Sequence, residues 1–139
     1  MPSARKPKLP GKEARLSKNQ ETLTILVVED EPLVRLMIVD FLRSSGCGVV
    51  EAASGEAAVE VLQLRDGIDV VFTDIQLGGT LDGWDVGETS RATHPMIPVI
   101  YTSGAVLVRD RTVSGSVFFD KPYDPAAVLA ACQTLRATH

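Results

Sequence analysis

Short runs of β-branched and other apolar residues alternate with amphipathic stretches along most of this chain. The runs predict five strands, at 24–28, 48–52, 69–73, 98–102 and 116–119. Between and after them, apolar residues recur at helical spacing and predict helices at about 32–45, 54–64, 82–93 and 124–136. Pro32, Ser54 and the pair Asp124–Pro125 favour a first helical turn and mark helix starts. Such alternation is typical of parallel βαβ units.

The predicted fold is α/β, a doubly wound five-stranded parallel sheet with helices on both faces. Five strands favour the flavodoxin-like order 2-1-3-4-5, in which the first and third strands lie side by side at the switch point of the sheet. A chain of 139 residues is long enough for one such domain, which we place at residues 21–139.

Polar residues follow four of the predicted strands. Glu29 and Asp30 come directly after the first strand, Asp74 after the third and Ser103 after the fourth, and Lys121 comes just beyond the fifth. In open parallel sheets, ligands bind beyond the carboxyl ends of the strands. Carboxylates, a hydroxyl and an ammonium at these ends predict a pocket for a divalent cation and a phosphoryl group.

Carboxylates at neighbouring strand ends repel each other, by about 4 kcal/mol for a close pair at an effective dielectric constant of 20. A cation would offset this repulsion, and Mg²⁺ is the expected one because it prefers oxygen ligands. Taken alone, Glu29, Asp30 and Glu31 would suit a solvated helix N-terminus, where acidic side chains are favourable. Asp74 at the end of a second buried strand, with Lys121 near another, favours the metal site instead.

Composition is that of a globular protein, with 45% apolar and 23% charged residues. No apolar run is long enough to span a bilayer, and the first residues lack the apolar stretch of a signal peptide, so we expect a cytoplasmic protein without membrane contact. Cys47 and Cys132 lack metal-ligand spacing and are expected to be buried, reduced thiols.

Charge is distributed unevenly between the two ends of the chain. Residues 1–20 contain six Lys or Arg and one Glu, whereas residues 21–139 contain eight basic and seventeen acidic residues. Because the first segment also has few apolar residues, we expect a disordered basic tail. No nucleic-acid-binding module accompanies the tail, so nucleic acid is not an expected partner.

Five short motifs stand in a characteristic order and spacing: VVEDEP at 27–32, FTD at 72–74, DG at 82–83, PVIYTSG at 98–104 and FDKPY at 119–123. Over about residues 22–138, the chain thereby resembles the receiver domain of two-component response regulators. The resemblance implies that Asp74 takes a phosphoryl group from a sensor histidine kinase, a histidine phosphotransferase or a small acyl phosphate. It also implies that Asp30, Asp74 and the backbone carbonyl of Gln76 bind Mg²⁺, with Glu29 acting through a water molecule.

The same resemblance implies roles for the other residues near the strand ends. Lys121 and the metal would neutralise charge on the transferring phosphoryl group. Ser103 would hydrogen-bond a phosphoryl oxygen, and Gly104 would leave room for that oxygen and offer a backbone N–H. Phe118, three positions before Lys121, would change rotamer as the Ser103 loop moves inward.

The chain departs from the family pattern at two places. The fourth position after the acceptor, usually proline in receivers, is Gly78, so we expect a more mobile loop over the site. Only seventeen residues separate Ser103 from Lys121, several fewer than usual. The helix that normally follows the fourth strand is therefore expected to be short or absent.

The first predicted helix has more apolar residues than one buried face needs. A sufficient core stripe at helical spacing is formed by Val34, Met37, Ile38, Phe41 and Leu42. Leu33, Leu36 and Val39 would then point partly outward. They would either pack on the last helix or dock the helix that bears the donor histidine, as the corresponding face does in receivers. We assign these three residues to partner binding, since exposed apolar patches often mark interaction sites.

The favoured interpretation is a single-domain response regulator that catalyses only its own phosphoryl transfer and dephosphorylation and is not a turnover enzyme. One alternative is a receiver-like interaction module that works without phosphorylation, against which the complete set of strand-end residues argues. A less favoured alternative is a Mg²⁺-dependent aspartyl-phosphate phosphatase. Such an enzyme requires a second aspartate two residues after the nucleophile, where this chain has Gln76.

Overall fold

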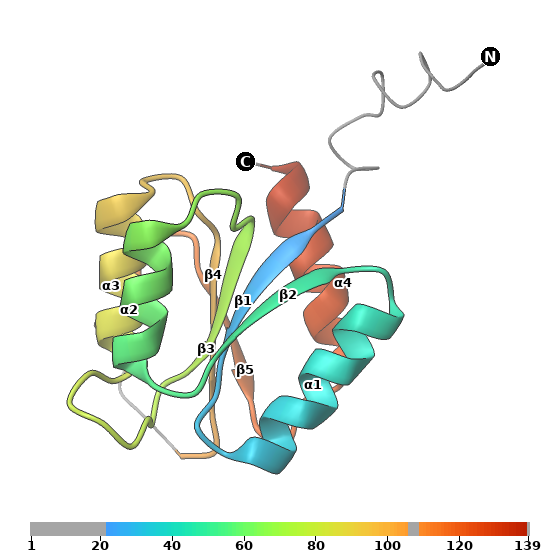
Figure 1. Cartoon of the computed structure of the whole chain (residues 1–139), viewed down its shortest axis with the longest axis horizontal. Helices are drawn as coiled ribbons and strands as arrows, with labels where there is room; N and C mark the ends of the chain where they lie inside the picture. The colour runs from blue at the N-terminus through green and yellow to red at the C-terminus, as the bar shows by residue number, and fades with distance from the viewer. Residues whose placement is uncertain (1–21, 106–108, 139) are drawn as a thin grey trace.

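The computed structural model describes residues 22–105 and 109–138, which form five strands and four helices (Figure 1). Their order is β1 (Thr24–Val28), α1 (Pro32–Ser44), β2 (Gly48–Ala52), α2 (Gly55–Leu64), β3 (Val70–Asp74), α3 (Gly83–Thr93), β4 (Val99–Ser103), β5 (Val117–Asp120) and α4 (Pro125–Ala137). Every predicted element is present, with bounds within one residue of the prediction. The expectation of a disordered tail at 1–20 lies outside the described residues. Within them, no helix is long and apolar enough to cross a membrane.

The sheet is parallel throughout and has the order β2-β1-β3-β4-β5, which confirms the predicted flavodoxin-like topology. Helices α1 and α4 cover one face, and α2 and α3 cover the other (Figure 1). Strands β3 and β4 are buried along their whole length, which explains why each begins with three apolar residues in a row. This order brings the carboxyl ends of β1 and β3 side by side.

Side-chain caps fix where three of the helices begin. The Ser54 hydroxyl accepts a hydrogen bond from the Ala57 N–H at 3.0 Å at the start of α2. At the start of α3, Asp82 and Asp85 each accept a hydrogen bond from the other's backbone N–H. The Asp124 carboxylate accepts one from the first turn of α4. These caps hold the helix starts next to the carboxyl ends of the strands.

The inward face of α1 differs from the predicted one. Val39, predicted to point outward, is only 3% exposed, whereas Met37, predicted to face the core, is 69% exposed. The prediction was wrong because it counted only apolar residues, and the polar Arg35 occupies an inward position one turn before Ile38 and Val39. The large apolar side chains that α1 exposes are Leu33, Leu36 and Met37.

The connection between β4 and β5 contains no helix in its described parts, residues 104–105 and 109–116. Polar contacts hold it to the domain instead. Arg111 forms ion pairs with Glu88 at 2.8 Å and Asp85 at 3.3 Å on α3. The Val113 N–H donates a hydrogen bond to the buried Tyr101 hydroxyl at 3.2 Å. These contacts hold residues 109–116 against α3 and against Tyr101 of β4.

The two cysteines, both free thiols, differ in burial. Cys132 is fully buried in α4, as predicted, and burial raises the pKa of its thiol to about 12. Cys47 is only partly buried, which corrects the prediction, because it lies in the exposed turn between α1 and β2.

Candidate functional site

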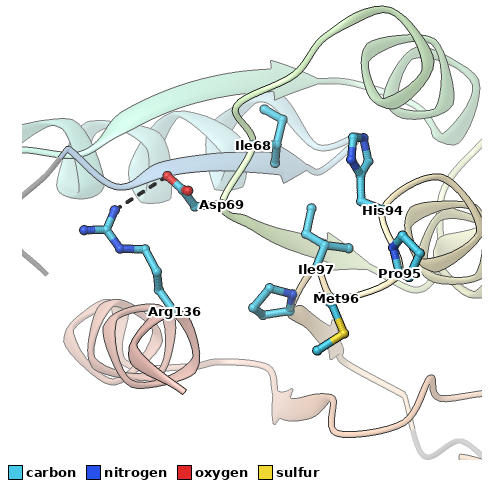
Figure 2. A pocket seen from close by; sticks show the side chains of 8 residues that line it. Ile68, Asp69, His94, Pro95, Met96, Ile97 and Arg136 are labelled. Atoms are coloured by element: carbon cyan, nitrogen blue, oxygen red, sulfur yellow. Dashed lines mark ion pairs between the residues drawn. The ribbon is translucent and has the colours of Figure 1, made fainter. Parts of the chain in front are cut away.

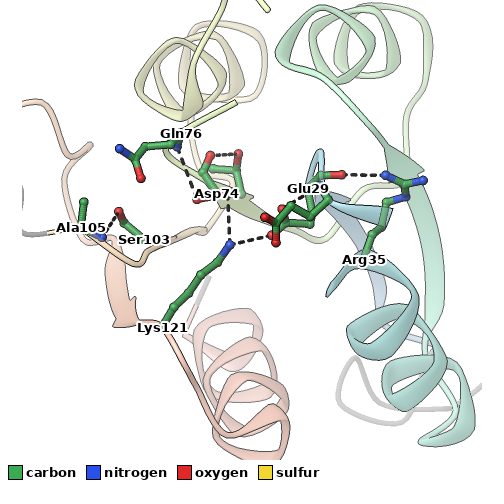
Figure 3. Close-up of polar contacts among 9 residues, drawn as sticks. Glu29, Arg35, Asp74, Gln76, Ser103, Ala105 and Lys121 are labelled. Atoms are coloured by element: carbon green, nitrogen blue, oxygen red, sulfur yellow. Dashed lines mark hydrogen bonds and ion pairs between the residues drawn. The ribbon is translucent and has the colours of Figure 1, made fainter. Parts of the chain in front are cut away.

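The carboxyl ends of β1, β3 and β5 bring charged side chains into direct contact (Figure 3). Lys121 Nζ donates hydrogen bonds to Glu29 Oε1 at 2.9 Å and to Asp74 Oδ2 at 3.1 Å. One carboxylate oxygen from each of Glu29, Asp30 and Asp74 lies within 4.8 Å of the other two. The fold thus gathers four residues from three separate parts of the sequence at one point.

Burial makes the negative charge of this cluster unfavourable unless further positive charge is close by. Glu29 is 3% exposed and Asp74 is 5% exposed. Burial raises the pKa of both carboxyls, although the Glu31 N–H acts in the opposite direction at Glu29, as does the Lys121 charge at Asp74. Burial disfavours the charged form of Lys121, but its hydrogen bonds and its attraction to both carboxylates raise its pKa overall. The cluster is therefore a pocket rich in oxygen and negative charge that suits a divalent cation.

Arg35 of α1 holds the backbone of this site. Its Nη1 donates a hydrogen bond to the Glu29 carbonyl at 2.8 Å (Figure 3). Its Nε donates one to the Glu51 carboxylate of β2 at 3.2 Å. It thereby ties the end of β1 to β2 and fixes the position of Glu29. Sequence reasoning missed Arg35, although its helical spacing from Ile38 and Leu42 was a usable signal.

The residues after β3 and β4 surround the cluster. The Gln76 N–H donates a hydrogen bond to Asp74 Oδ1 at 3.3 Å (Figure 3). Ser103 is buried, and its hydroxyl accepts a hydrogen bond from the Ala105 N–H at 3.1 Å. The hollow between the strand ends is lined by Asp30, Glu31, Asp74, Gln76, Gly104 and Lys121. Gly104 is therefore one of the residues that line this hollow, whereas Ser103 is not.

Phe118 does not join the charged cluster, because its side chain packs against the core on the face of the sheet that α2 and α3 cover. Its ring centre is 6.4 Å from the ring centre of Tyr101. The guanidinium carbon of Arg109 lies 3.7 Å from the Phe118 ring centre, and Arg109 also forms an ion pair with Asp120 at 3.1 Å. Phe118 is therefore held between a buried ring and a surface cation.

A second hollow lies at the opposite end of the sheet, before β3 and β4 (Figure 2). There Arg136 of α4 forms an ion pair with Asp69 at 3.6 Å. His94 makes a hydrogen bond to a backbone carbonyl of α2 at 3.2 Å. Within residues 22–105 and 109–138, the cluster at the carboxyl ends is the only group of three possible metal ligands. That cluster is therefore the candidate site.

Comparisons with known proteins show which family this chain belongs to. Residues 25–133 match the response regulator receiver domain. Over 82 residues, 58% of this chain, it is 42% identical to the sensor kinase CckA of Brucella abortus, of which it covers 9%. A response regulator receiver protein from Sinorhizobium medicae is 32% identical with a TM-score of 0.80, and the match covers 84% of this chain and 96% of that one. The receiver domain of a Pseudomonas aeruginosa sensor histidine kinase, solved with a magnesium ion in its active site cleft, is 27% identical with a TM-score of 0.74, covering 84% and 99%.

The family match covers most of the chain, and the fold agrees with it. The chain spans half or less of the length of the first curated relatives that it matches. Receiver domains take phosphoryl groups from histidine kinases or phosphotransferases and bind Mg²⁺ at an acidic site of the kind seen here. The chain belongs to the response regulator receiver domain family, the phosphoacceptor domains of two-component signalling.

Proposed function

We propose that Asp74 accepts a phosphoryl group from the phosphohistidine of a sensor histidine kinase or histidine phosphotransferase. The observation that carries the proposal is the pairing of Asp74 with Lys121 at the edge of the hollow, 3.1 Å from Oδ2 to Nζ. In this position the ammonium would neutralise the negative charge that develops during phosphoryl transfer. The protein would act as a phosphorylation switch and not as a turnover enzyme on an external substrate.

The transfer forms one bond and breaks another. A carboxylate oxygen of Asp74 attacks phosphorus, and the P–N bond of phosphohistidine breaks with its electron pair returning to the imidazole nitrogen. With acetyl phosphate as the donor, the P–O bond to the acetyl group breaks and acetate leaves. Lys121 favours the ionised form of Asp74 that this attack requires and opposes the effect of burial on its pKa.

The donor set of the cluster suits Mg²⁺. Asp30, Asp74 and the backbone carbonyl of Gln76 would hold the ion, with Glu29 acting through water. Support comes from the grouping of one carboxylate oxygen from each of Glu29, Asp30 and Asp74 within 4.8 Å of one another. When bound, the ion supplies positive charge that offsets the carboxylates and the phosphoryl oxygens.

Ser103, Gly104 and Phe118 would convert the phosphorylation of Asp74 into a change of surface. The Ser103 hydroxyl would turn from the Ala105 N–H to donate a hydrogen bond to a phosphoryl oxygen, and the Gly104 N–H would serve as a second donor. Phe118 would follow this inward movement and leave the Arg109 guanidinium. The rearranged β4–β5 surface would then be the one that a downstream protein binds.

The direct test is the intact mass of the protein after incubation with acetyl phosphate, with and without Mg²⁺. We expect the wild type to gain one phosphoryl group only when Mg²⁺ is present and Asp74→Asn to gain none. Asp40→Asn, a matched change on the exposed face of α1, should behave as the wild type. If folded wild-type protein binds Mg²⁺ but gains no mass from acetyl phosphate or from a phosphorylated histidine donor, it is a phosphorylation-independent interaction module.

The exposed apolar side chains of α1 are proposed to dock the helix that carries the donor histidine. Leu33 and Leu36 are 75% and 61% exposed. The same helix contributes to an apolar groove, which also reaches Lys121. The groove is lined by Val34, Met37, Ile38, Pro122, Tyr123 and Pro125. A helix seated here would bring its histidine next to Asp74. Val39 is removed from the partner-binding set because it is buried.

Leu36→Glu is expected to slow phosphoryl transfer from a histidine kinase by about tenfold or more, which corresponds to a loss of about 1.4 kcal/mol of docking energy. Phosphorylation by acetyl phosphate should remain unchanged, because Leu36 does not line the site. The matched control is Leu64→Glu at the far end of α2, where the side chain is 79% exposed. Rates measured with both donors decide the matter, and an equal loss with kinase and acetyl phosphate would contradict the docking role.

A further inference from the structure

The loop between β3 and α3, residues 75–82, is closed at its base and contains two consecutive glycines, Gly78 and Gly79. The Gly83 N–H donates a hydrogen bond to the Ile75 carbonyl at 2.8 Å, which joins the two ends of the loop. Receivers usually have proline where this chain has Gly78, and proline would restrict the backbone of the loop itself. Here the loop depends on contacts from outside for its shape.

Glu56, in the first turn of α2, supplies such a contact. Its Oε2 accepts a hydrogen bond from the Thr80 N–H at 2.9 Å. A Cβ at position 79 would stand 2.6 Å from Glu56 Oε1, so the bare backbone of Gly79 packs against the carboxylate. The hydrogen bond from the Thr80 N–H lowers the pKa of Glu56 below its ordinary value. The start of α2 also lies close to the loop, because Gly55 packs directly against Leu81.

The same loop forms one wall of the acidic site. Its first residues include Gln76, whose N–H bonds to Asp74 at 3.3 Å. Gly78 lies against Asp30, with 3.3 Å from a Cβ position there to Asp30 Oδ2. Only one residue separates Gly78 from Thr80, so a shift of the segment held by Glu56 would also move the backbone beside Asp30.

We propose that Glu56 is a positioning residue for the Mg²⁺ site, which holds the 76–80 loop at the distance from Asp30 and Asp74 that metal binding requires. The proposal rests on the proposed function only in taking the cluster as a Mg²⁺ site. Glu56 would do from α2 what proline does within the loop in other receivers. The expected loop mobility at Gly78 would then be suppressed by a carboxylate twenty-two residues away in sequence.

Three variants test this role by Mg²⁺ titration calorimetry. Glu56→Ala is expected to weaken Mg²⁺ binding by about tenfold, the lower end of the effect of residues that orient metal ligands. Glu56→Gln should recover most of the affinity, because its amide oxygen also accepts the Thr80 N–H. Glu60→Ala, which removes an exposed charge one turn further along α2, should bind Mg²⁺ as the wild type does.

Two outcomes would overturn the role of Glu56. If Glu56→Ala lowers the unfolding midpoint but leaves Mg²⁺ affinity unchanged, Glu56 supports the fold alone. If Glu56→Gln and Glu60→Ala weaken binding as much as Glu56→Ala does, the effect is one of charge and not of loop position. Failure of the proposed function would be seen separately, as wild-type protein that binds Mg²⁺ and gains no phosphoryl group.

Discussion

Asp74→Asn is expected to stabilise the metal-free protein, although it removes a hydrogen-bonded side chain. Asp74 and Glu29 are almost completely buried, and burial raises the pKa of both carboxyls, so folding disfavours their charged forms. Two carboxylates about 4 Å apart repel each other by about 4 kcal/mol at an effective dielectric constant of 20. The substitution removes this repulsion, but it also removes the attraction between Asp74 and Lys121, which offsets part of the gain. The expected net gain in the free energy of unfolding is about 1–2 kcal/mol.

Adding Mg²⁺ should reverse this order of stabilities. At a concentration one hundred times its Kd, a bound ion adds about 2.7 kcal/mol to the wild type, and most of this gain should be missing in Asp74→Asn. Urea unfolding in EDTA and in excess Mg²⁺ measures both effects, with Asp40→Asn as the control for an exposed aspartate. A lower unfolding midpoint for Asp74→Asn in EDTA would be incompatible with the crowded geometry of the cluster.

The pH dependence of the metal-free protein provides a second check on the same charges. The ordinary pKa values are 3.8 for Asp74 and 4.5 for Glu29, and both are raised in the folded state. The folded protein therefore binds these protons more tightly than the unfolded chain does. The stability that they contribute is fully present below the ordinary values and is lost as pH rises through the raised ones. As pH rises over this interval, Asp74→Asn should lose less of its free energy of unfolding than the wild type does.

Strand order and strand ends were predictable because they depend on patterns that are local in sequence. Apolar runs located the five strands, and five strands alternating with helices favoured the flavodoxin-like order 2-1-3-4-5. Once the order was known, Glu29 and Asp74 had to be adjacent, and Lys121 had to follow two strands further along. Such inference needs no knowledge of side-chain conformation.

Contacts made by polar residues between elements were not predictable in the same way. Arg35 on α1 is half-buried and donates a hydrogen bond to the Glu29 carbonyl, whereas Met37 is exposed. The spacing of apolar residues does not reveal such a hydrogen bond, so it assigned Met37 to the core. Glu56 stands in the first turn of α2, where acidic residues are common, and only the packed structure shows that its carboxylate contacts the loop at Thr80. Both cases depend on the exact approach of two elements, which periodicity does not specify.

The close approach of α3 to β4 at Gly87 leads to the other large expected effect. A helix-interior Gly→Ala change usually stabilises a protein, by about 0.5–1 kcal/mol. Here the added Cβ would meet the hydroxyl of Tyr101 and stand 2.8 Å from its Cζ. Tyr101 is fully buried and also packs against Trp84, with 5.1 Å between the ring centres, so it has little room to move. Gly87→Ala should therefore destabilise the protein, by about 2 kcal/mol.

A double-mutant cycle with Tyr101→Phe isolates this contact. Tyr101→Phe alone removes the acceptor of the Val113 N–H and should cost about 1 kcal/mol. In the double variant the clash is partly relieved, so the two changes should cost less together than separately, with a coupling of about 1 kcal/mol or more measured by urea unfolding. Additive costs would show that α3 moves away from β4 instead of pressing on Tyr101. Because Gly87 does not line the acidic hollow, any folded fraction of Gly87→Ala should still be phosphorylated by acetyl phosphate.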